Sequence, residues 1–157
     1  MSSAANQNAV QQLLTDAFDL LDRGELDRWT DLFTEDGRYV VTTRENLEQK
    51  LPGHLLGCEN KDQIRDRIFY LLRGSAYAQV HSRHFWTPVQ LSQKADGSFS
   101  CRSNFAIFNT NQDGESELYV VGAYNDLITF EDGQPKLKER IAVLDTAAVP
   151  TQLALPV

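Results

Sequence analysis

Hydrophobic residues in the first half of the chain recur at three- and four-residue spacing, the period of an amphipathic helix. Segment 9–23 shows this period most clearly and ends at Gly24, a residue type that often terminates helices. The shorter segment 25–33 predicts a second helix. A third is predicted over 60–74, because Asn60 is a good N-cap and a glutamine follows three residues later. The apolar stripe of the first segment consists of Val10, Leu13, Leu14, Ala17, Phe18 and Leu21.

Extended runs dominate the second half of the chain. The β-branched residues at 38–43 predict one early strand. The stretch 44–60 is expected to be irregular, because it contains a proline and glycines at close spacing. Four long runs follow, separated by Asp-Gly pairs that favour tight hairpins, since both residues tolerate positive φ. The runs are 83–93, 99–111, 117–130 and 136–146, with Asp96-Gly97, Asp113-Gly114 and Asp132-Gly133 between them.

This order of elements predicts an α+β fold, in which a curved antiparallel meander wraps around three N-terminal helices. The order resembles the cone-shaped domain shared by nuclear transport factor, ketosteroid isomerase and scytalone dehydratase. We expect a single domain over 1–157, with residues 1–8 disordered or extended. The apolar segment 147–157 has no helix or strand period and is expected to dock as a tail. Because the cone fold hosts both enzymes and scaffolds, it does not decide function.

Composition narrows the classes of partner. The chain has 157 residues, of which 41% are hydrophobic and 24% charged, and its formal net charge is −7. An acidic chain without a basic run disfavours nucleic acid and anionic membranes as partners. No apolar stretch reaches the roughly 18 residues that cross a bilayer, and the first residues lack the pattern of a secretory signal. With two cysteines far apart in sequence, a reducing cytoplasmic location is expected.

The histidines do not have the spacing of a metal site. The chain has three, His54, His81 and His84, and no Cys-x-x-Cys or His-Glu-x-x-His motif. His81 and His84 stand near the start of a predicted strand, where residues three apart point to opposite faces. No metal site is therefore predicted.

Acid–base chemistry has three candidates by residue type: His84, Asp126 and Tyr39. A general base needs a partner and a shielded pocket, and neither is visible in the sequence. The simpler interpretation is that Arg83 and His84 form hydrogen bonds on a partly exposed strand.

Carboxylates in the last predicted strand favour a structural ion pair. Glu139 and Asp145 alternate with Leu137, Ile141 and Val143 and would share a mostly apolar face. A buried charge must be paired. Arg67 lies beside the apolar stripe of the third predicted helix and is expected to bridge one of these two carboxylates.

Six short stretches together resemble one known family. They are RWTDLFTEDGRYVVTTREN, IRDRI, HSRH, GAYNDLI, LKERIAVLDT and PTQLALPV, in this order over about 20–157. The chain resembles the small (β) subunit of aromatic-ring-hydroxylating oxygenases. In that family the large α subunit carries the Rieske iron–sulfur cluster and the mononuclear iron. The β subunit has the cone fold and assembles with α as an α3β3 hexamer.

The resemblance implies a subunit with no catalytic, cofactor-binding or metal-binding residues of its own. It implies an α subunit as partner. Self-association as a trimer is expected from the residues themselves, because the long meander strands leave more aromatic and polar surface than three helices can cover. The stretch Arg44 to Asn46 is similar to members that act on aromatic acids such as salicylate. Residues expected in interfaces or in the scaffold are Arg44, Glu45, Asn46, Arg67, Arg83, His84, Trp86, Arg140 and Asp145.

Two functions from different classes therefore remain open. The first is the non-catalytic β subunit of the terminal oxygenase in a multicomponent aromatic-ring-hydroxylating dioxygenase. The second is a free-standing cone-fold dehydratase or isomerase that uses His84 or Asp126 in its own pocket.

Overall fold

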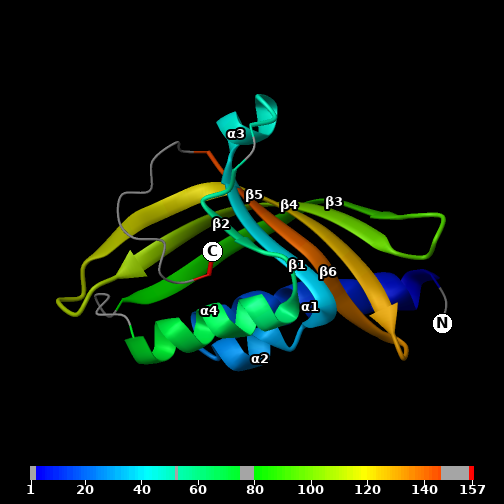
Figure 1. The fold of residues 1–157 in the computed structure, drawn as a ribbon, viewed down its shortest axis with the longest axis horizontal. Helices are drawn as coiled ribbons and strands as arrows, with labels where there is room; N and C mark the ends of the chain where they lie inside the picture. The colour runs from blue at the N-terminus through cyan, green and yellow to red at the C-terminus, as the bar shows by residue number, and fades with distance from the viewer. Residues whose placement is uncertain (1–2, 52, 75–79, 146–155) are drawn as a thin grey trace.

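The computed structural model describes residues 3–51, 53–74, 80–145 and 156–157. Three of its helices lie on one side of a curved sheet, and a fourth, short helix stands away from the body of the molecule (Figure 1). The helices are α1 (Ser3–Asp22), α2 (Leu26–Thr30), α3 (Arg44–Glu48) and α4 (Lys61–Gly74).

One six-stranded sheet holds the described strands together, in the order β2-β1-β6-β5-β4-β3. Neighbours are antiparallel, except that β1 runs parallel to β6. The predicted four-stranded meander is confirmed as β3 to β6. The strands are β1 (Phe33–Thr43), β2 (Leu56–Cys58), β3 (His81–Gln93), β4 (Phe99–Thr110), β5 (Ser116–Glu131) and β6 (Gln134–Leu144).

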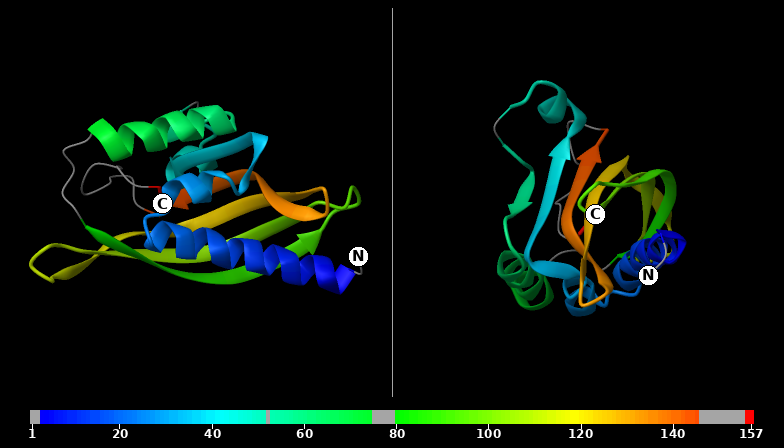
Figure 2. Two further views of the ribbon diagram at one scale, coloured as in Figure 1. Left: turned by 90° about the horizontal axis from the view of Figure 1, so that it is seen from below. Right: turned by 90° about the vertical axis from the view of Figure 1, so that its right-hand side faces the viewer.

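The sheet curls around α1, as the end-on view in Figure 2 shows. The inner face of the sheet and the apolar stripe of α1 form the hydrophobic core, and α2 and α4 close its side. The predicted α+β cone fold is confirmed. The stripe predicted for the first helix is buried at every position: Val10, Leu13, Leu14, Ala17, Phe18 and Leu21.

The first helix is longer than its apolar stripe. It begins at Ser3, so the disordered or extended start predicted for residues 1–8 is wrong from Ser3 onward. The added residues are mostly alanine, asparagine and glutamine, which show no apolar period although alanine favours helix. At the other end Gly24 has φ +70°, and its N–H donates to the carbonyl of Leu21 at 3.0 Å, which satisfies an otherwise free carbonyl.

The third predicted helix is confirmed as α4, together with its cap. The Asn60 side chain accepts a hydrogen bond from the Gln63 N–H at 3.0 Å. The Gln63 side chain in turn accepts from the Glu59 N–H at 2.8 Å, one residue before the N-cap. The helix buries Ile64 and Ile68 against the sheet.

The stretch predicted to be irregular, 44–60, contains two short elements. Helix α3 forms because the Thr43 hydroxyl accepts a hydrogen bond from the Asn46 N–H at 3.1 Å. Strand β2 forms because it pairs with β1, with Tyr39 opposite Cys58. Neither element has a hydrophobic period of its own, so the prediction is wrong here.

A β-bulge changes which side chains of β6 face the core. Glu139 pairs with Leu127 and Leu137 with Ile128, so Lys138 has no partner residue on β5. The extra residue inverts the alternation of side chains. Leu137 and Arg140, three apart in sequence, are consequently both buried.

The prediction that Arg67 forms a buried ion pair with Glu139 or Asp145 beneath the third helix is therefore wrong, because neither carboxylate is buried there. Glu139 is partly exposed and binds Arg38 at 3.1 Å, while Asp145 is exposed and lies 3.8 Å from Arg44. Arg67 is half-buried on α4, in a depression beside β2.

The fully buried ion pair of the core joins Arg140 on β6 to Asp126 on β5. The Arg140 Nε and Nη2 atoms each donate to one Asp126 carboxylate oxygen at 2.9 Å. Both side chains are 0% exposed. The guanidinium carbon lies 4.9 Å from the ring centre of Phe18 and 4.8 Å from that of Tyr124. Burial opposes the charged form of Arg140, but the Asp126 carboxylate outweighs this effect and raises the arginine pKa above its usual value.

We predict that Arg140→Ala lowers the free energy of unfolding by about 3–5 kcal/mol, because it leaves the Asp126 carboxylate buried without its partner. Arg65→Ala on the exposed face of α4 is the control and should change it by no more than about 0.5 kcal/mol. Urea titration measures both. The double variant Arg140→Met with Asp126→Leu should recover most of the loss. Equally small losses at Arg140 and Arg65 would contradict the role of the ion pair.

Candidate functional site

A second buried polar pair lies where α1 ends against β3. The Asp22 carboxylate oxygen Oδ1 is 2.7 Å from His84 Nδ1 and accepts the backbone N–H of His84 at 2.9 Å. The other oxygen faces Arg83 Nη1 at 3.4 Å. The Asp22 side chain is 10% exposed and the His84 side chain 1%.

This geometry decides the tautomer of His84. A carboxylate only accepts hydrogen bonds, so the hydrogen of the neutral imidazole lies on Nδ1 and the lone pair on Nε2. The Nε2 atom is buried and has no hydrogen-bond partner among the described residues. An acidic residue that orients a histidine in this way is the arrangement found in many general bases.

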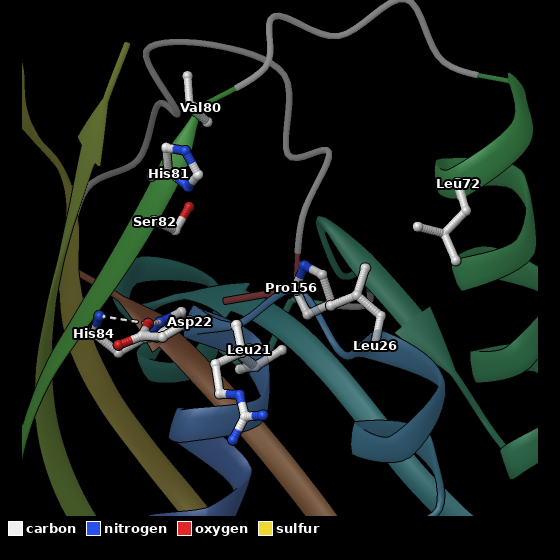
Figure 3. A pocket seen from close by; sticks show the side chains of 11 residues that line it. Leu21, Asp22, Leu26, Leu72, Val80, His81, Ser82, His84 and Pro156 are labelled. Carbon is white, nitrogen blue, oxygen red and sulfur yellow. Dashed lines mark hydrogen bonds and ion pairs between the residues drawn. The ribbon is translucent and has the colours of Figure 1, made fainter. Parts of the chain in front are cut away.

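The pair borders a cavity of about 220 Å³ between the end of α1 and the start of β3 (Figure 3). Apolar side chains from α1, α2 and α4, together with Val80 just before β3 and Pro156, form much of the wall. Polar side chains lie along its β3 side, where Asp22 and His84 face each other. The described lining residues are Leu21, Asp22, Arg23, Gly24, Leu26, Leu72, Val80, His81, Ser82, His84 and Pro156.

More unpartnered polar atoms lie inside the curl of the sheet. The Tyr124 hydroxyl, the Arg140 Nη1 atom and the Trp29 indole nitrogen are buried and have no partner among the described residues. Phe18 connects this group to the Asp22–His84 pair, with its ring centre 5.9 Å from His84 and 5.3 Å from Tyr124. Burial raises the pKa of the Tyr124 hydroxyl, which therefore stays neutral.

Tyr39 binds the described end of the chain. Its hydroxyl donates to the Val157 carbonyl oxygen and accepts the Val157 N–H, each at 3.0 Å. Burial raises the pKa of this hydroxyl as well. Pro156 and Val157 are buried. The other residues of the predicted docked tail, 147–155, lie outside the described residues.

The three candidate bases from the sequence thus have different surroundings. Asp126 is occupied by Arg140 and Tyr39 by Val157. Of the three, His84 lines the cavity between α1 and β3. Its partner Asp22 is absent from the sequence prediction, because 62 residues separate the two and no motif connects them.

The described part of the chain contains no group of three His, Cys, Asp or Glu side chains that could hold a metal ion. His81 is exposed and His84 buried, as expected for strand residues three apart. Cys58 and Cys101 are free and buried. Burial raises the pKa of both thiols, in Cys101 to about 11. None of the described helices is both long and apolar enough to span a membrane.

Most of the residues predicted for interfaces lie on the surface. Arg44 and Glu45 are exposed on α3, which projects beyond the sheet in Figure 1, and Asn46 is half-buried there. Trp86 is half-buried and packs against Phe18, with ring centres 4.9 Å apart. His84 and Arg140 are the exceptions, since both are buried.

The outer face of the sheet carries an exposed apolar cluster. Phe85 and Phe108 meet edge to face with ring centres 5.6 Å apart. Leu118 pairs directly with Phe108 across β4 and β5, and Val121 is opposite Ala106 on the same strands. Exposed fractions run from 37% for Phe108 and Val121 to 59% for Phe85. We call Phe85, Phe108, Leu118 and Val121 the outer-face cluster.

A family model described as "Ring hydroxylating beta subunit" matches residues 17–151. The chain belongs to the ring-hydroxylating β-subunit family. This match includes the whole sheet and both residues of the Asp22–His84 pair. It begins within α1, so it contains the C-terminal end of that helix and Phe18 of its stripe.

Individual relatives agree with this family. The anthranilate 1,2-dioxygenase small subunit of Burkholderia cepacia is 31% identical over 137 residues, which are 87% of this chain and 85% of the relative. A β subunit of the terephthalate 1,2-dioxygenase terminal oxygenase component of a Comamonas species is 29% identical and covers 87% and 88%.

Solved structures agree as well. A Novosphingobium aromaticivorans protein assigned as the β subunit of an aromatic-ring-hydroxylating dioxygenase has a TM-score of 0.87 at 28% identity, with 99% of each chain covered. A protein of the same organism assigned as a scytalone dehydratase has a TM-score of 0.72 at 16% identity, covering 97% and 92%. The second likeness concerns the fold alone.

We predict that Asp22→Ala destabilises this β-subunit family member by about 2–3 kcal/mol, because the His84 ring and backbone N–H groups lose a buried acceptor. Asp19→Ala, three residues earlier on the exposed side of α1, is the matched control and should stay within about 0.5 kcal/mol. Urea titration at neutral pH checks both values. A loss at Asp22 no larger than that at Asp19 would contradict the structural role of the pair.

Proposed function

We propose that this chain is the non-catalytic β subunit of the terminal oxygenase of an aromatic-ring-hydroxylating dioxygenase. Its role is to support an α subunit that carries the Rieske cluster and the mononuclear iron. The observation that carries the proposal is the family match over residues 17–151, together with relatives aligned over most of both chains. A Rieske cluster needs two cysteines and two histidines, and a mononuclear iron site needs two further histidines and a carboxylate. The chain has two cysteines and three histidines in total.

The substrate of the assembly is proposed to be an aromatic acid. The relatives at 31% and 29% identity are subunits of anthranilate and terephthalate dioxygenases. Anthranilate and terephthalate are both benzene carboxylates, so the proposed substrate class follows the chemistry that these two names share.

The proposed assembly is an α3β3 hexamer, and the isolated chain is proposed to form a trimer. The outer-face cluster supports a subunit contact, because it brings two aromatic and two aliphatic side chains together on an exposed surface. Helix α3 offers a second contact, since Leu47, Leu51 and Leu55 in and after it are 44–50% exposed.

The alternative is a free-standing dehydratase or isomerase. This alternative needs His84 or Asp126 as the group that moves a proton. Both carboxylate oxygens of Asp126 accept hydrogen bonds from Arg140, and Asp126 is not among the described residues that line the cavity, so this part of the alternative has less support. The Asp22–His84 pair beside a cavity is the observation in its favour.

We predict that the purified chain is colourless, contains no stoichiometric iron and oxidises no aromatic compound. Co-expressed with an α subunit and supplied with an electron-donor chain, it should form a complex that hydroxylates an aromatic acid, with the iron in α. Size-exclusion chromatography with light scattering, an iron assay and product analysis test this. In a complex of native size and iron content, His84→Ala should leave turnover nearly unchanged. A hundredfold loss there, or dehydratase activity of the isolated chain abolished by the same variant, would favour the alternative.

We also predict that the double variant Phe85→Asp with Leu118→Asp reduces assembly. Both side chains are more than half exposed, so the fold should tolerate the change, while two buried carboxylates would disrupt a contact. Light scattering should report a smaller particle than wild type, with an unchanged circular dichroism spectrum. Lys94→Asp in the β3–β4 hairpin is the matched control and should assemble normally. Wild-type particle size in the double variant, with and without α, would rule out the outer-face cluster as the contact.

A further inference from the structure

Helix α4 exposes two apolar side chains in a groove beside α2, its neighbour in Figure 2. Phe69 and Leu72 are 53% and 54% exposed, and both line this groove, which has a volume of about 540 Å³. Exposed apolar surface with a polar surround is typical of a protein-binding site. The described lining residues are Asp27, Asp31, Arg65, Asp66, Phe69, Leu72 and Arg73.

The carboxylates of the groove are only partly matched by cations. Asp31 lies 3.7 Å from a guanidinium nitrogen of Arg65 and 3.9 Å from Lys61 Nζ. Asp27 and Asp66 are exposed and form no ion pair with any other described residue. Two carboxylates, one from each helix, therefore remain for a cation that comes from another molecule.

These side chains define the chemistry of a matching partner. An apolar side chain would pack against Phe69 and Leu72, and a cation beside it would face Asp27 and Asp66. The Phe69 ring already has a cation over it, since the guanidinium carbon of Arg73 lies 4.6 Å from the ring centre. The incoming cation therefore pairs with the carboxylates, a role that favours arginine, whose fork of donors matches a carboxylate.

A second copy of this chain matches the groove less well. Its formal net charge is −7, so two copies repel each other at an acidic contact. The outer-face cluster shares no residue with the groove and offers a surface for self-association instead. The groove is therefore assigned to an unlike subunit.

We propose that the groove between α2 and α4 binds a segment of the α subunit that presents an arginine or lysine next to an apolar side chain. The cation pairs with Asp27 and Asp66, and the apolar side chain packs against Phe69 and Leu72. This inference rests on the proposed function, because it takes the α subunit as the partner. It adds a contact surface that neither the outer-face cluster nor α3 provides.

The test co-expresses each variant of the full chain with an affinity-tagged α subunit. Mass photometry of the purified complex over a dilution series then gives the dissociation constant. Asp27→Lys with Asp66→Lys should raise it at least about tenfold, because like charges would face each other. Asp27→Asn with Asp66→Asn keeps the side-chain shape and should raise it about threefold to tenfold. The control, Asp113→Lys with Glu131→Lys, changes the net charge equally at exposed hairpin positions and should stay within about twofold.

A second pair of variants tests the apolar half of the contact. Phe69→Ala should raise the dissociation constant about tenfold. Tyr70→Ala, on the same helix but outside the described lining and 72% exposed in the parent, should stay within about twofold. In all variants the isolated chain should keep its circular dichroism spectrum and its particle size.

Three outcomes would overturn the proposal, and they differ in what else they affect. Wild-type dissociation constants in the charge variants and in Phe69→Ala would refute the groove contact and leave the proposed function intact. A smaller particle for the isolated chain carrying the two lysines, with its spectrum unchanged, would assign the groove to a second copy. If the wild-type chain forms no complex with α, the groove contact and the proposed function both fail.

Discussion

The ion pair between Arg140 and Asp126 is the constraint on which the inner face of the sheet depends. A guanidinium and a carboxylate, both fully buried, must face each other at hydrogen-bonding distance, because either one alone would carry an uncompensated charge in the core. Their strands are adjacent, and Asp126 is directly opposite Arg140 in the β5–β6 register. The rings of Phe18 and Tyr124 then cover the guanidinium, which joins α1 to the sheet through a charge as well as through apolar contacts.

The bulge at Lys138 is what brings this pair inside. In regular strand alternation Leu137 and Arg140 would lie on opposite faces, and one of them would leave the core. The extra residue lets Leu137 contribute to the core at one end of β6 while Arg140 does so in the middle. It also turns Glu139 to the partly exposed side, where Arg38 binds it. One inserted residue therefore decides which charges of this strand are buried and which are at the surface.

The inner face of the sheet forms the core, whereas the outer face presents exposed apolar side chains. The inner face is occupied by α1, by the buried ion pair and by Val157 bound to Tyr39, and a cavity lies beside Asp22 and His84. The outer face presents the cluster around Phe85 and Phe108, and α3 extends away from the body (Figure 1). A chain of the ring-hydroxylating β-subunit family can thus offer surfaces for subunit contacts on one side of a sheet whose other side is packed as the core.

The sequence by itself determined the α+β order, the apolar stripes of α1 and α4, and the meander of β3 to β6, because these depend on local periodicity, caps and Asp-Gly turns. It also indicated the family, through six stretches in a fixed order. The tertiary structure decided which polar residues meet. Asp22 reaches His84 across 62 residues, and β2 exists because it pairs with β1. With the bulge in β6, the predicted carboxylates Glu139 and Asp145 are not buried, and the buried carboxylate of the ion pair is Asp126. Side-chain pairing across strands depends on register, and a bulge shifts register without leaving a local signal in the sequence.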